Sequence, residues 1–141
     1  MTGIMRMAET RTFTFYRRVT GSDIRSGPCT NQVELSEDRR GLFLRLASTA
    51  RFSILLNRSG VTGLIDAVAN TAAAGATPGD VMGTHEHHGA LRMRVTAPAD
   101  GGAVTLTLAP GGDEISVVFS SREREELLGH LRGGLNLLRG P

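Results

Sequence analysis

The chain has 141 residues, of which 40% are hydrophobic and 21% are charged, and this balance excludes a disordered polymer. A chain of this length fits one domain. All 16 basic residues are arginines, the formal net charge is +2, and the single cysteine, Cys29, excludes an intramolecular disulfide. No apolar run approaches the roughly 20 residues of a membrane-spanning helix, and no signal peptide is evident. We therefore expect a cytoplasmic protein with no membrane contact.

The charges are unevenly distributed along the chain. Residues 1–58 contain ten arginines and five acidic residues, whereas residues 59–141 contain six arginines and nine acidic residues. Any basic surface should therefore lie mainly in the first half.

The first half alternates apolar and polar residues after a leader, residues 1–10, that we expect to be flexible. Alternation with period two predicts half-buried strands. These are "RTFTFYRRV", "NQVEL", "LFLRLA" and "RFSILLN", with "GSDIRSGPC" as a loop between the first two. Four apolar residues then recur at the spacing of one helical face: Val61, Leu64, Ile65 and Val68. We expect an amphipathic helix there, with Ser59 as its N-cap.

The second half repeats this plan. Its strands are "VMGTHEHH", "ALRMRV", "AVTLTLA" and "ISVVFS", and the segment "SREREELLGHLRGGLNLL" forms a second amphipathic helix. Ser120 and Glu123 have the spacing of a capping box. The apolar stripe of this helix consists of Leu127, Leu128, Leu131, Leu135 and Leu138.

The two halves align without gaps over residues 52–68 and 115–131, with apolar positions in register. We therefore expect an α+β fold with two ββββα units, residues 11–75 and 80–139, in a single domain, residues 11–141. Each unit would form an antiparallel sheet that a helix covers on one face. The surplus leucines of the second helix, Leu135 and Leu138, suggest a homo-oligomer whose subunits pack through helices.

The histidines of "THEHHG" are candidates for a metal site. On a strand, His85 and His87 would point the same way at roughly 6.5 to 7 Å, a spacing that can chelate a metal. A zinc site needs three or four protein ligands, however, and the chain has no CxxC or HExxH motif. A polar hairpin that includes His88 explains the segment more simply, and a small-ligand or metal site remains an alternative.

No catalytic signature is present. Cys29 has no neighbouring base, and the chain lacks GxxxxGK[ST], GxGxxG and GxSxG motifs. We predict no enzymatic activity, no catalytic residue, no bound metal and no cofactor.

The outward side of the predicted strands combines arginines with aromatic residues. Guanidinium groups bind phosphates and aromatic rings stack on bases, which is the chemistry of single-strand binding. The predicted nucleic-acid-binding residues are Tyr16, Arg18, Phe43, Arg45, Arg51, Arg92 and Arg94. The main hypothesis is binding of single-stranded DNA or RNA across the sheets with low sequence specificity. A protein-interaction face is the competing interpretation of the same residues.

The strand, turn, strand, helix order of "GLFLRLASTARFSILLNRSGVTGLIDAV" resembles a PUR repeat, and the whole arrangement resembles the Whirly-like fold. That resemblance implies binding of single-stranded DNA or RNA on the sheets. It also implies that Phe43 and Arg45, and then Arg51, are the first contact residues.

A second resemblance is to the SsgA-like regulators of actinobacteria, which have a similar fold. "TPGDV" after the first helix is similar to an element of that family, and the lysine-free, arginine-rich composition suits such a host. This resemblance implies a regulatory scaffold that acts in cell division or sporulation through a protein partner.

Overall fold

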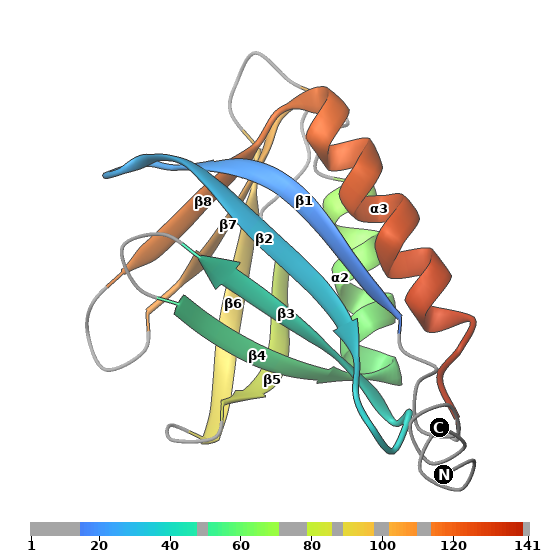
Figure 1. Cartoon of the computed structure of the whole chain (residues 1–141). Helices are drawn as coiled ribbons and strands as arrows, with labels where there is room; N and C mark the ends of the chain where they lie inside the picture. Colours follow the sequence, from blue (N-terminus) through green and yellow to red (C-terminus); the bar gives the residue numbers. More distant parts are fainter. Residues whose placement is uncertain are drawn as a thin grey trace, which may run out of the picture.

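The structure, a computed structural model, describes residues 15–47, 51–70, 79–85, 89–97, 102–109 and 114–139. Within these ranges the chain forms strands and helices in the order shown in Figure 1. The strands are β1 (Tyr16–Asp23), β2 (Gly27–Leu35), β3 (Gly41–Ala47), β4 (Arg51–Asn57), β5 (Gly79–His85), β6 (Gly89–Thr96), β7 (Val104–Leu108) and β8 (Ile115–Phe119). The helices are α2 (Arg58–Asn70) and α3 (Ser121–Leu135). The expected leader, residues 1–10, lies outside the described ranges.

All of these strands belong to one closed antiparallel barrel, in which each strand pairs with the next along the chain and β8 pairs with β1. The two halves of the chain meet at both seams. At the β4/β5 seam Leu55 lies opposite Thr84, and at the β1/β8 seam Ser22 lies opposite Val118. The expected α+β fold of two ββββα units with separate open sheets is therefore wrong. Alternation specifies which side chains point inward, but it does not specify which strand edges meet.

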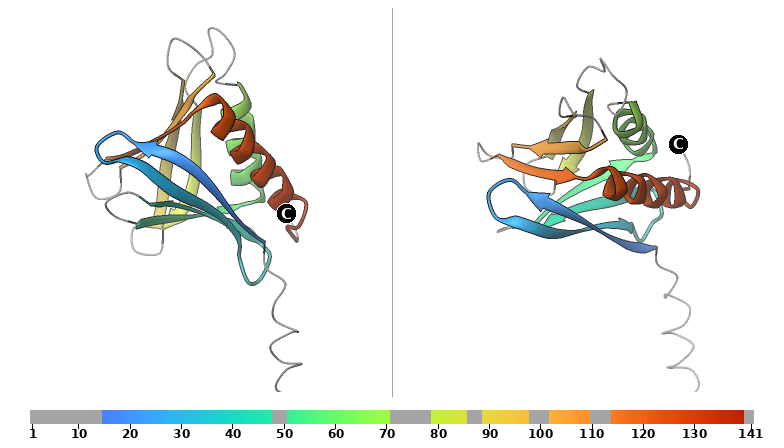
Figure 2. Two further views of the ribbon diagram at one scale, coloured as in Figure 1. Left: turned by 45° about the horizontal axis from the view of Figure 1, so that its top comes forward. Right: turned by 90° about the horizontal axis from the view of Figure 1, so that it is seen from above.

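The two helices lie next to each other on the same side of the barrel (Figures 1 and 2). Helix α2 follows β4 but packs mainly against β5, and α3 follows β8 but packs mainly against β1 and β2. Each helix therefore contacts strands from both halves of the chain. This packing replaces the expected arrangement in which each helix covers the sheet of its own unit.

The alternation did predict the inward side of the strands correctly. In β3, Leu42, Leu44 and Leu46 are fully buried, whereas Phe43 and Arg45 are half-buried on the outer face. The expected faces of both helices are buried as well: Val61, Leu64, Ile65, Val68, Leu127, Leu128 and Leu131. Burial of these apolar side chains is the main favourable contribution to folding.

The two leucines near the end of α3 pack within the chain. Leu138 is buried in the core, and Leu135 is partly buried against it. The segment after α3 is held in place because Arg58 donates a hydrogen bond from Nη2 to the carbonyl oxygen of Leu138 at 2.7 Å. These leucines therefore do not provide a surface for a second copy, and a homo-oligomer through the helices stays a prediction.

The helix starts follow from hydrogen-bonding side chains. The predicted capping box of α3 is confirmed, because Ser120 Oγ accepts from the Glu123 amide at 3.2 Å and Glu123 Oε1 accepts from the Ser120 amide at 2.9 Å. The expected cap of the first helix is wrong. Asn57 Oδ1 accepts from the Gly60 amide at 2.8 Å, so Asn57 takes the place assigned to Ser59, which lies inside α2.

The loop expected at "GSDIRSGPC" is shorter than its composition suggested. Asp23 Oδ1 accepts hydrogen bonds from the amides of Arg25 and Ser26, at 2.8 and 3.0 Å, and so closes a tight turn. Gly27, with a φ of 90°, then starts β2 in a conformation that other residues rarely adopt. As a result β1 and β2 form a long hairpin.

Candidate nucleic-acid interface

The register of β1 to β4 arranges the outward side chains in two rows that cross the four strands. We call the first the aromatic row; it consists of Tyr16, Glu34, Phe43 and Leu55. We call the second the arginine row; it consists of Arg18, Gln32, Arg45 and Ser53. Neighbouring members of a row are on adjacent strands about 4.8 Å apart, and the two rows are roughly 7 Å apart along each strand.

Each arginine of the second row lies over a ring of the first. The Arg18 Cζ atom is 5.7 Å from the centroid of the Tyr16 ring, and the Arg45 Cζ atom is 4.6 Å from the centroid of the Phe43 ring. Both distances fall within the range of cation–π attraction. Tyr16 is 38% exposed, so its ring is accessible to a ligand.

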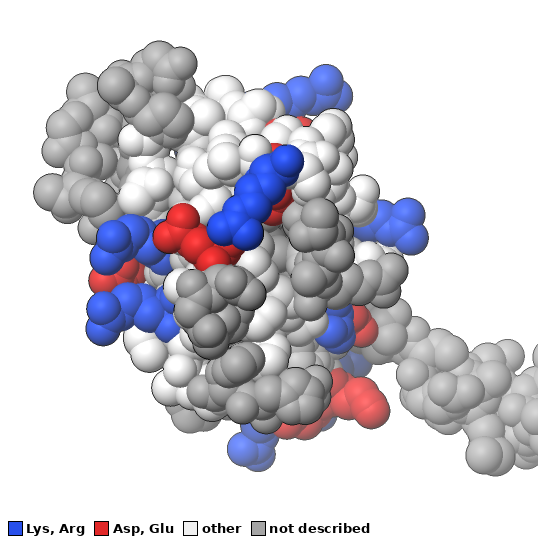
Figure 3. Space-filling view, turned by 90° about the vertical axis from the view of Figure 1, so that its left-hand side faces the viewer, with Lys and Arg blue, Asp and Glu red and all other residues white. Residues whose placement is uncertain are grey.

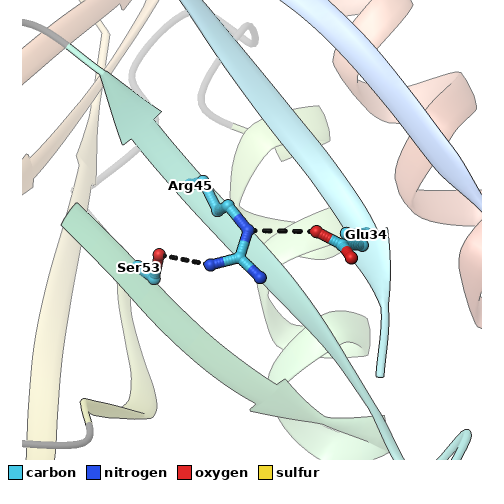
Figure 4. Close-up of polar contacts among 3 residues, drawn as sticks. All are labelled: Glu34, Arg45 and Ser53. Atoms are coloured by element: carbon cyan, nitrogen blue, oxygen red, sulfur yellow. Dashed lines mark hydrogen bonds and ion pairs between the residues drawn. The ribbon is translucent and has the colours of Figure 1, made fainter. Parts of the chain in front are cut away.

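Arg45 is held in one orientation by two further contacts, which Figure 4 shows. Its Nε atom donates to Glu34 Oε1 at 3.1 Å, and its Nη1 atom donates to Ser53 Oγ at 2.8 Å. The side chains of Arg45 and Glu34 are 36% and 33% exposed, so this ion pair adds little to stability but neutralises the guanidinium charge locally. Arg18, by contrast, has no acidic partner among the described residues.

A groove of about 710 Å³ runs over this part of the outer face. Its lining includes all four residues of the arginine row, together with Glu34 of the aromatic row. Cys29 also lines the groove, and burial is the largest of several effects that together raise the pKa of its thiol. A raised pKa favours the protonated thiol, which is the less nucleophilic form.

Arg92 and Arg94 lie elsewhere on the barrel. They extend from β6, where their Nε atoms are 3.9 and 3.7 Å from the carboxylate oxygens of Asp80 on β5. The structure therefore does not bring them into contact with Arg18 or Arg45. Figure 3 shows the same tendency on the face that it draws, where arginines occupy several separate places, some next to acidic side chains.

The remaining predicted contact residue is Arg51. Its backbone belongs to β4 opposite Ala47, but its side chain lies outside the part that the structure describes. Six of the seven predicted residues therefore have described side chains, in two separate regions. The β1–β4 face holds Tyr16, Arg18, Phe43 and Arg45. Arg92 and Arg94 lie beside Asp80.

The histidine segment does not form a described metal site. The ring of His85 stacks on Phe52 with a centroid separation of 4.3 Å and an interplanar angle of 2°. Residues 86–88, which include His87 and His88, lie outside the described ranges. Among the residues that are described, no group of three or more metal-binding side chains is close enough to hold an ion.

The sequence analysis missed two members of the rows, Gln32 and Glu34. The sequence did indicate that both residues point outward. Their neighbours Val33 and Leu35 were expected to point inward, and successive side chains of a strand point to opposite faces. Neither residue is an arginine or an aromatic residue, so the chemistry of single-strand binding did not indicate them. Their position beside Arg18, Arg45 and the two rings follows only from the strand register.

In the described part of the chain, neither helix is long and apolar enough to cross a membrane. No protein-family model matches the sequence, and no significant match to a curated protein or to a solved structure was found.

Proposed function

We propose that the outer face of β1 to β4 binds single-stranded DNA or RNA with low sequence specificity. The observation that supports this most directly is the pair of rows, in which arginines lie beside accessible aromatic rings. Aromatic side chains stack on any base because every base has a π face, and arginine pairs with phosphate. The similarity of residues 41–68 to a PUR repeat is a second reason for the proposal. Such a function also fits a cytoplasmic protein.

The proposal assigns different tasks to the residues of the face. Tyr16 and Phe43 stack with bases, and the guanidinium of Arg18 contacts a phosphate because no acidic residue of the described ranges competes for it. Arg45 supports the Phe43 ring from above, since its own hydrogen bonds to Glu34 and Ser53 already fix it. Arg92 and Arg94 are left out of the site because they lie on β6, away from the two rows, and because Asp80 offsets part of their charge.

Fluorescence anisotropy of a labelled poly-pyrimidine single strand, titrated at several salt concentrations, tests this assignment. Arg18→Ala should weaken binding and reduce the slope of log K against log salt by about 0.7, the value for one phosphate contact on a single strand. Tyr16→Ala should weaken binding by roughly 5- to 150-fold, which corresponds to about 1 to 3 kcal/mol of stacking, and should leave the slope unchanged.

Arg92→Ala is the matched control, because it removes another exposed arginine from a different part of the barrel. The assignment would be wrong if Arg92→Ala weakened binding as much as Arg18→Ala. If the unmodified protein failed to bind the strand at low salt, the nucleic-acid function itself would be refuted. The competing hypothesis, a regulatory scaffold with a protein partner, would then be preferred.

A further inference from the structure

Glu34 is an acidic residue in the middle of a surface that we propose binds a polyanion. Its backbone lies directly opposite Tyr16 on β1 and opposite Phe43 on β3, and its carboxylate reaches Arg45 in the arginine row. The side chain is 33% exposed, and only Oε1 is engaged, by Arg45. Oε2 has no hydrogen-bond partner within the described ranges. The negative charge is therefore accessible to a ligand on this face.

The charge balance of the two rows is correspondingly small. Among their eight residues, Arg18 and Arg45 are positive and Glu34 is negative, which leaves a formal charge of +1. A ligand that offers only negative charge gains little from such a surface. A ligand that offers flat, neutral bases can use both rings and Leu55, and needs only one or two phosphates at the arginine row.

We propose that Glu34 makes the site select single strands over duplexes, by repelling phosphates from the middle of this face. This inference rests on the proposed function and names the residue that gives it selectivity. A duplex keeps its bases inside and presents phosphates outward, so some of them must face the carboxylate. A single strand can turn its bases toward Glu34, whose free oxygen accepts hydrogen bonds from base N–H groups, and keep its phosphates at the arginine row. Rejection of a competitor by like charge is a recognised route to specificity.

The position of Arg45 supports this role. Figure 4 shows that its third guanidinium nitrogen, which binds neither Ser53 nor Glu34, points toward the side on which Glu34 lies. The ion pair keeps the carboxylate close to the sheet, at a fixed place between the rows. Glu34 thus partly neutralises the charge of Arg45. It also makes phosphate binding unfavourable at its own position on the face.

The test compares a single strand and a duplex of equal length and label by anisotropy, for the unmodified protein and two variants. Glu34→Gln keeps the size of the side chain and removes the charge. Glu37→Gln removes the same charge from the exposed turn after β2 and is the matched control. We expect Glu34→Gln to strengthen duplex binding by roughly three- to tenfold more than single-strand binding, which is the order of magnitude for one like charge removed from a surface site. Glu37→Gln should change both affinities equally.

Several results would overturn the inference. One is an unchanged ratio of single-strand to duplex affinity in Glu34→Gln, and another is an equal change in the ratio for both variants. Thermal melting by circular dichroism shows whether Glu34→Gln is folded, and Glu34→Asp, which keeps the charge, should retain the selectivity of the unmodified protein. Failure of the unmodified protein to bind the single strand at all would instead refute the proposed function.

Discussion

Replacing Gly83 with alanine should destabilise the protein, because this glycine lies where β5 passes closest to β4. A Cβ atom at this position would be 2.5 Å from Ile54 Cγ1, 2.6 Å from Ile54 Cδ1 and 2.9 Å from Leu56 Cδ2. Ile54 and Leu56 are fully buried, so their side chains would have to shift within a densely packed core. The extra methyl group therefore overpacks the interior of the barrel at the seam between its halves.

The expected loss of stability in Gly83→Ala is the difference between two opposing effects. Overpacking a dense core costs about 1 to 3 kcal/mol. Exchange of glycine for alanine lowers the conformational entropy of the unfolded chain, which stabilises the folded protein by about 0.4 to 1 kcal/mol. The net loss of stability should lie between about 0 and 2.6 kcal/mol, with a midpoint of about 1.3 kcal/mol. Gly63→Ala is the control, since a Cβ at Gly63 of α2 meets nothing within 4 Å, and it should raise stability by about 0.5 to 1 kcal/mol.

A double-mutant cycle with Ile54→Ala identifies the contact itself. Ile54→Ala alone should cost about 2 to 5 kcal/mol. In the Gly83→Ala background it should cost less by about 1 kcal/mol or more, because the added methyl group fills part of the space that Ile54 leaves. Urea unfolding followed by circular dichroism suits the measurement, since the chain has no tryptophan and one tyrosine.

The reasoning would be refuted if Gly83→Ala were as stable as the unmodified protein and the cycle were additive. In that case β5 would not lie beside β4 with Gly83 against Ile54 and Leu56. An open sheet with β5 at a free edge would accept the alanine, and the closed barrel would have to be abandoned.

Two further predictions concern local hydrogen bonds. Ser120→Ala removes the capping side chain of α3 and should lower stability by about 1 kcal/mol, a fall in Tm of roughly 3 °C that a thermal melt would detect; an unchanged Tm would show that the capping box is dispensable. In the turn after β2, hydrogen bonds from the Arg40 amide and the Ser36 hydroxyl lower the pKa of Asp38 below its usual 3.8. A carboxyl group whose pKa is lower in the folded than in the unfolded state stabilises the fold at pH values above the unfolded-state pKa. This stabilisation is lost as the pH falls through the folded-state pKa. Asp38→Asn should therefore be less stable than the unmodified protein at pH 7, and urea midpoints should converge below about pH 3.8; a gap that persists in acid would contradict this cause.

Much of the local structure could be predicted from the sequence, because period-two alternation and helical spacing report burial directly. Leu42, Leu44 and Leu46 were expected inward and are fully buried. The closure of the sheet into a barrel could not be predicted from alternation or helical spacing. The seams depend on pairs such as Leu55 with Thr84, and neither residue carries a signal for its partner. Gly83 was a partial signal, since a glycine at an inward strand position often marks a close approach of another backbone or side chain.

The candidate site was predictable in its chemistry but not in its grouping. Arg18 and Arg45 were expected to point outward near aromatic rings, and they do. Arg92 and Arg94 satisfied the same rule, yet the closed barrel places them beside Asp80. A pattern of inward and outward residues describes each strand by itself, whereas a binding surface depends on which strands are neighbours.

The β1/β8 seam has a consequence for how the protein is made. The ladders from β1 to β8 each join strands that follow one another in the chain, but Ser22 and Val118 are about a hundred residues apart, and bringing such distant segments together costs roughly 4 kcal/mol of loop entropy. The barrel can close only after β8 has been synthesised, and α3, which packs on β1 and β2, emerges from the ribosome later still. Until then the edge of β1 that faces β8 is unpaired, and an unpaired strand edge invites pairing with other chains. We therefore expect the pairing of β1 with β8, the most distant contact, to limit the folding rate, and the unpaired edge of β1 to favour aggregation until that pairing forms.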